Sequence, residues 1–151
     1  MALQHELTAE LTQAHNAFLM AAFALSPHLR VQSGVCGTWT PKQVAAHAAA
    51  WNAETVARFD AFHEESAPDK QYDTDAFNAA AVAERSSLNW DQQMEQLNQS
   101  YQALLTAASK LSVSDFAREG RYEEWLRGRI ADYQEHTAQL EVWNDTALPN
   151  M

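Results

Sequence analysis

Apolar residues recur at helical spacing along most of the chain, which predicts an all-α fold. Four long amphipathic helices are expected at about 3–25, 41–66, 90–111 and 122–144, and a short one at 75–85. No segment shows a convincing strand pattern. The predicted architecture is a four-helix bundle with one short extra helix between the second and third long helices.

The start of the second long helix carries the clearest local signal. Thr40 can cap the helix, Pro41 suits its first position, and Gln43 completes a capping box with Thr40. Loops are predicted at 67–74 and at 112–120. The first of these loops is long enough to cross the bundle, so strict up-down order of the helices does not follow from the sequence.

Composition limits the classes of function. The 151 residues suit a single domain over 1–151, and 20 acidic against 10 basic residues give a formal net charge of −10. That charge disfavours binding to nucleic acid or to an anionic membrane surface. Residues 1–17 hold no Lys or Arg for a signal peptide, and no apolar run could span a bilayer. With a single cysteine, Cys36, a cytoplasmic protein is expected.

Two histidines lie on or beside apolar helix faces, His47 in the second long helix and His136 in the fourth. Asp132 precedes His136 by four residues, so both side chains share one face. Two imidazoles and a carboxylate meeting inside the bundle would suit a divalent transition metal with positions left open. The alternative is a metal-free cluster in which His47 contacts Asp132 or the backbone, and Asp132 pairs with Arg129 or Arg127.

Other candidate residues carry less weight. Glu54, two helical turns after His47, and Tyr133 are candidates for orienting the ligands or for catalytic proton transfer, although a core aromatic is the preferred interpretation of Tyr133. His5 and His15, on the flank of the first helix, are expected to be solvated or capping side chains.

Three segments resemble the DinB-like superfamily. Residues 37–51, with Trp39, Thr40 and His47, resemble its second helix, while 75–90 and 124–143 resemble its third-helix region and its fourth helix. The likeness is closest to ClbS/DfsB-like members and to relatives of mycothiol-dependent maleylpyruvate isomerases. It implies a four-helix bundle, commonly a homodimer. It also implies a divalent metal on three histidines, one from the second helix and an H-x-x-x-H pair from the fourth.

Carried over by residue, the resemblance makes His47, Asp132 and His136 the metal ligands, with Asp132 in place of the usual histidine. Aspartate can still bind zinc, nickel or iron. The implied function is a metal-dependent hydrolase or thiol-dependent transferase, using a low-molecular-weight thiol in the second case, with a small electrophilic molecule as substrate. The alternative is a non-catalytic, metal-free dimer that binds or sequesters a small molecule.

Overall fold

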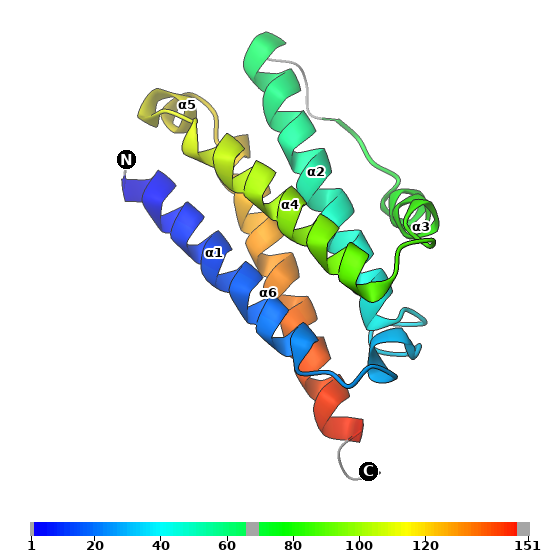
Figure 1. Cartoon of the computed structure of the whole chain (residues 1–151). Helices are drawn as coiled ribbons and strands as arrows, with labels where there is room; N and C mark the ends of the chain where they lie inside the picture. Colours follow the sequence, from blue (N-terminus) through cyan, green and yellow to red (C-terminus); the bar gives the residue numbers. More distant parts are fainter. Residues whose placement is uncertain (1, 66–69, 148–151) are drawn as a thin grey trace.

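Figure 1 shows a computed structural model of the chain, which describes residues 2–65 and 70–147. The elements are α1 Ala2–Phe23, the 3-10 turn η1 Leu29–Val31, α2 Pro41–Glu65, α3 Thr74–Glu84, α4 Trp90–Ser109, α5 Val113–Arg118 and α6 Arg121–Ala147. The four long helices and α3 confirm the predicted all-α bundle with a short extra helix. Among the described residues no strand forms, only an isolated bridge between Cys36 and Trp39.

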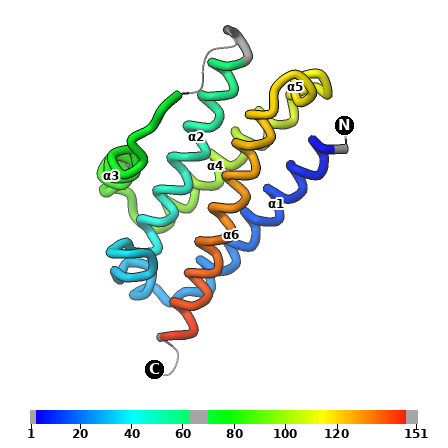
Figure 2. Tube along the Cα trace, turned by 180° about the vertical axis from the view of Figure 1, so that it is seen from behind, coloured from blue at the N-terminus to red at the C-terminus, as the bar shows by residue number. Residues whose placement is uncertain are grey.

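The long helices form a ring in which α2 packs against α4 and α6, and α1 packs against α6 and α4. Seen from behind in Figure 2, α6 lies between α2 and α1. Helices α1 and α6 run parallel to each other (Figure 1). Helices α2 and α4 are also parallel to each other, and both run antiparallel to α1 and α6. The segment that holds α3 therefore crosses back along the bundle between α2 and α4.

Reciprocal hydrogen bonds at the helix starts explain where α2 and α4 begin. The Thr40 and Gln43 side chains each accept a hydrogen bond from the other residue's backbone N–H, at 3.1 and 2.9 Å, which confirms the predicted capping box. Asn89 and Gln92 make the same arrangement before α4, at 2.8 and 2.9 Å. These bonds satisfy backbone donors that a helix start leaves without a partner.

The loop predicted over 112–120 is wrong, because α5 forms there. Ser112 caps the helix, and its side chain and that of Asp115 accept hydrogen bonds from each other's backbone N–H. This is a third capping box, with aspartate in the place usually taken by glutamate or glutamine. The predicted loop at 67–74 falls partly outside the described residues, and 70–73 are not helical.

The first turns of α2 are enclosed on every side. All of residues 44–50 are buried, and five of these seven residues are alanines. Small side chains let α4 and α6 approach α2 closely, while α3 and the segment around Trp39 cover its remaining sides. His47, in the middle of this stretch, is consequently withdrawn from water.

In the described part of the chain, no helix combines the length and the apolar character needed to cross a membrane.

The cap of α4 can be tested by replacing Asn89 with Ala. Loss of the side-chain bond to the Gln92 N–H should lower the free energy of unfolding by about 1 kcal/mol, measured by urea denaturation. Gln99→Ala, at an exposed position within the same helix, is the matched control and should change stability by less than about 0.5 kcal/mol. Equal effects of the two substitutions would contradict the capping role.

Candidate functional site

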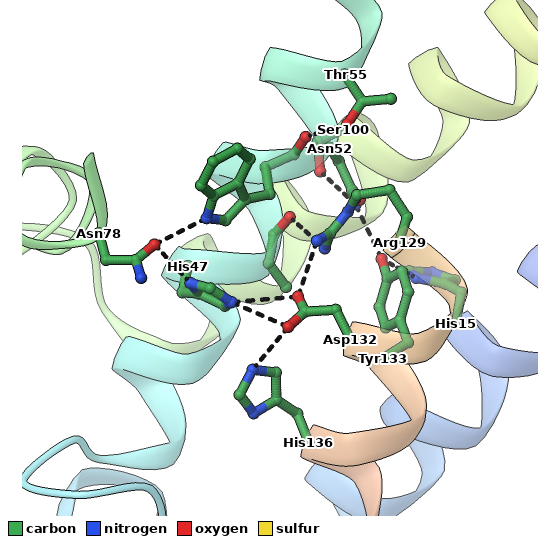
Figure 3. A network of polar contacts seen from close by, with 12 residues as sticks. His15, His47, Asn52, Thr55, Asn78, Ser100, Arg129, Asp132, Tyr133 and His136 are labelled. Carbon is green, nitrogen blue, oxygen red and sulfur yellow. Dashed lines mark hydrogen bonds and ion pairs between the residues drawn. The ribbon is translucent and has the colours of Figure 1, made fainter. Parts of the chain in front are cut away.

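His47, Asp132 and His136, singled out from the sequence, meet between α2 and α6 (Figure 3). Their potential ligand atoms all lie within 4.8 Å of one another. His47 Nε2 is 3.1 Å from Asp132 Oδ2, and His136 Nε2 is 3.1 Å from Asp132 Oδ1. The fourth-helix pair is positioned by its i, i+4 spacing, and antiparallel packing brings His47 opposite Asp132.

The tautomer of His47 is set by its other neighbours. The indole N–H of Trp51 donates to Asn78 Oδ1 at 2.8 Å, which identifies that amide atom as the oxygen. The same oxygen lies 3.0 Å from His47 Nδ1, so Nδ1 must carry a proton and donate it. In a neutral His47 the lone pair is then on Nε2, directed at the Asp132 carboxylate. Asn78 belongs to α3, so the crossover segment contributes directly to the site.

His136 repeats this arrangement on the other side of the carboxylate. Its Nδ1 lies 2.7 Å from Gln139 Oε1, an acceptor, which leaves Nε2 facing Asp132. If both rings carry their only proton on Nδ1, two lone pairs face the carboxylate across 3.1 Å, which is unfavourable. A cation between them, either a further proton on a ring or a metal ion, removes that repulsion. Histidine ligands of metals commonly donate their distal N–H to a carbonyl in this way.

Arg129 is a buried cation attached to the same carboxylate. Its Nη1 donates to Asp132 Oδ2 at 2.8 Å, its Nε to Asn52 Oδ1 at 3.0 Å and its Nη2 to the Ala48 carbonyl at 3.3 Å. Asp132 therefore pairs with Arg129, one of the partners considered from the sequence. The other, Arg127, pairs instead with Glu123 on the exposed face of α6.

The pKa values follow from these contacts. Burial alone would raise the pKa of the Asp132 carboxyl, but hydrogen bonds with His136 and His47 and the charge of Arg129 outweigh it and hold the pKa below its usual range. Burial has the opposite effect on His136, yet its hydrogen bond to Asp132 and the Asp132 charge raise its pKa above 6.5. Asp132 is thus the stable anion of the cluster.

A hydrogen-bonded chain leads from Arg129 across the bundle. Asn52 donates to the Tyr133 hydroxyl at 2.9 Å, and that hydroxyl lies 2.9 Å from His15 Nδ1. His15 also stacks on Tyr101, with ring centroids 3.8 Å apart. The expectation of a solvated or capping His15 is wrong, because the residue is only 1% exposed. Burial lowers its pKa to about 4, and raises that of Tyr133 to about 12.

Glu54 and Tyr133, the candidates for proton transfer, make no direct contact with the cluster of His47, Asp132 and His136 among the contacts of the described residues. Glu54 accepts hydrogen bonds from Tyr72 at 2.7 Å and Lys70 at 3.0 Å, which, against the effect of burial, lower its pKa. Its hydrogen-bond partners belong to the segment before α3, and the charge of Arg58 in α2 also lowers its pKa; none of these residues belongs to the cluster. Tyr133 has its hydroxyl satisfied within the core, in line with the preferred interpretation. Its link to Asp132 is indirect, through Asn52 and Arg129. His5 is exposed, as expected.

The residues present fit a divalent metal ion. Two neutral imidazole nitrogens and one carboxylate oxygen form a donor set that zinc, nickel and iron accept. Ligand atoms around a tetrahedral ion with bonds of ~2.1 Å lie roughly 3.4 Å apart, close to the 3.1–3.3 Å between the imidazole and carboxylate atoms here. The three side chains are 10, 19 and 7% exposed for His47, Asp132 and His136, so water has limited access.

A comparison with protein-family models gave a match to the DinB superfamily over residues 4–140. The chain belongs to the DinB superfamily. Neither the search of curated proteins nor that of solved structures produced a match. The matched range includes every residue of the cluster and of the hydrogen-bonded chain that supports it. The two subfamilies named from the sequence stay predictions within this superfamily.

The pairing of Arg129 with Asp132 can be tested by Asp132→His. The substitution leaves the Arg129 guanidinium buried without its carboxylate, so the free energy of unfolding should fall by about 3–5 kcal/mol. Adding Arg129→Leu should restore most of the loss in urea denaturation. Asp145→His, at an exposed position of α6, is the control and should be nearly neutral. A double variant no more stable than the single one would show that the pair is not the cause.

Burial of neutral His15 predicts a pH dependence of stability. The unfolded chain binds a proton at this residue below pH 6.5, whereas the folded protein does so only below about 4, so stability should rise with pH across this window. The contribution is about 3 kcal/mol. In urea denaturation between pH 4 and 7, His15→Gln should lose this part of the pH slope, and His5→Gln should retain it. An unchanged slope in His15→Gln would refute the assignment.

Proposed function

We propose that this DinB-superfamily protein is a metal-dependent enzyme, a hydrolase or a thiol-dependent transferase, acting on a small electrophilic molecule. His47, Asp132 and His136 would hold a zinc, nickel or iron ion. The observation that carries the proposal is the orientation of the two imidazoles. Hydrogen bonds to Asn78 and Gln139 direct both Nε2 atoms at one carboxylate, which leaves a place for a cation.

The residues around the cluster have defined parts in such a centre. Asn78 and Gln139 keep the proton of each histidine on Nδ1, so that Nε2 is free to bind. Arg129 holds Asp132 in its ionised state and takes one of its oxygens, which leaves Oδ1 as the oxygen without a bond to the guanidinium. The bound ion would supply Lewis acidity and lower the pKa of a water or thiol at an open position.

Trp39 gives the centre an apolar side. Its ring lies 5.2 Å from that of His47, and the indole of Trp51 reaches the site through Asn78. Aromatic walls exclude water and suit an organic substrate. Neither Glu54 nor Tyr133 touches the three candidate ligands in the contacts described above, so we propose no catalytic role for them.

One observation favours the second candidate function, a metal-free protein that binds or sequesters a small molecule. The Asp132 carboxylate already accepts a hydrogen bond from Arg129, and protonated His47 and His136 would complete its partners. Such a cluster would be stable without an ion. The homodimer, the cytoplasmic location and the low-molecular-weight thiol stay predictions from the sequence.

Metal content separates the two candidates. Untagged protein purified without chelator should carry a substantial fraction of one transition-metal ion per chain, measured by inductively coupled plasma mass spectrometry. His47→Ala and His136→Ala should remove the ion, because each leaves only two ligands. His28→Ala, at an exposed position outside the cluster, should retain it.

The metal-free function predicts a different outcome of the same experiment. Protein that stays without metal after equilibration with zinc, nickel or iron(II) would overturn the enzyme proposal. His47→Ala would then change the thermal stability and leave metal content at the background level of the unaltered chain.

A further inference from the structure

We propose that the centre takes its exogenous ligand as a small anion, of the hydroxide, thiolate or carboxylate class, because Arg129 neutralises the carboxylate among its ligands. This inference rests on the proposed metal centre and names the kind of molecule that completes it. The observation behind it is the 2.8 Å contact between Arg129 Nη1 and Asp132 Oδ2, inside a cluster that is largely withdrawn from water.

The charges around the cluster can be counted from the contacts. Asp132 contributes one negative charge and Arg129 one positive charge, and His47 and His136 are neutral when they act as ligands. A divalent ion in this donor set would therefore retain its two positive charges. Without Arg129, the carboxylate would cancel one of them.

The charge of Arg129 acts at short range and with little screening. The side chain is 7% exposed, and Asn52, the Ala48 carbonyl and Asp132 hold its guanidinium on three sides. A charge in such a place is far less screened by solvent and salt than an exposed one.

Carboxylates other than Asp132 do little to offset the positive charge of Arg129. Glu54 is paired with Lys70 and bonded to Tyr72. Glu135 acts on His136 electrostatically, but Glu135 is exposed, so solvent weakens its effect. Among the described contacts of the cluster, Asp132 is the carboxylate that touches it directly.

A small ligand can reach the cluster at the carboxylate. The Asp132 side chain is 19% exposed, more than either histidine, so the limited access of solvent to the cluster is greatest on that side. An anion arriving there would meet the uncancelled charge of the ion. This preference is common to a hydroxide, which hydrolysis requires, and to a thiolate, which thiol transfer requires.

The test uses the cobalt(II)-loaded protein and two probes that bind metal ions, the azide anion and neutral imidazole, at constant ionic strength. Visible absorption of the cobalt follows both titrations. Arg129→Gln should retain cobalt and bind azide ~10- to 100-fold more weakly, because one nearby positive charge is gone. The affinity for imidazole should change much less.

Two further variants complete the design. Arg127→Gln removes one positive charge from the exposed face of the same helix and should leave azide affinity within about twofold of the original protein. Asn52→Asp keeps Arg129 but places a carboxylate against its Nε, so it should weaken azide binding as Arg129→Gln does. This variant provides the test if Arg129→Gln fails to fold.

The outcomes distinguish this inference from the proposed function. If the unaltered protein does not bind cobalt, the metal centre is wrong and the inference falls with it. If cobalt binds but azide affinity is equal in the unaltered protein, in Arg129→Gln and in Asn52→Asp, the metal centre stands and the inference is overturned. A selective loss of azide binding in Arg129→Gln or Asn52→Asp, with imidazole little changed, supports it.

Discussion

The burial of Arg129 is the constraint on which the interior of this bundle depends. A guanidinium out of water requires a carboxylate and further acceptors, since an unpaired buried charge costs several kcal/mol. Asp132 supplies the charge, and Asn52 and the Ala48 carbonyl supply the remaining acceptors. All of these bonds join α6 to α2 or lie within α6. The register between these two helices is therefore specified by polar geometry as well as by apolar packing.

That register also explains why the cluster opposite Arg129 is well formed. His47 lies one residue before Ala48, whose carbonyl receives Arg129, and His136 lies one helical turn after Asp132. A slip of α6 along α2 would break the bonds of Arg129 and separate the imidazoles at the same time. The hydrogen bonds of Arg129 thus both stabilise the packing of α6 on α2 and position the histidines of the site.

Helical periodicity made much of the fold predictable, including the long helices, the Thr40 cap and the convergence of His47 with Asp132 and His136. Each of these predictions depends on the spacing of residues within one helix, or on the presence of a polar residue on the same helix face as apolar ones. The helix at 113–118 was predictable in principle from its capping box, in which Asp115 takes the place of the more usual glutamate.

The support of the site was harder to anticipate, because it depends on pairs of helices meeting in one register. His15 lies between Leu11 and Phe18 on the apolar face of α1, a signal that the expectation of a solvated histidine overlooked. The roles of Asn52 and Asn78 have no comparable signal. Short polar side chains on helices are usually exposed, and only the tertiary structure shows that these two bond Arg129 and His47.

The order of the helices around the ring has a consequence for how the chain reaches this structure. Within residues 2–65 and 70–147, α2 and α4 are the only long helices adjacent in sequence that pack extensively, and the main partners of α1 are α4 and α6. Consecutive hairpins therefore cannot assemble the bundle one after another. Helix α1 can pack only after α4 and α6, which are distant from it in sequence, have formed. Folding should therefore be slower than in an up-and-down bundle of similar length.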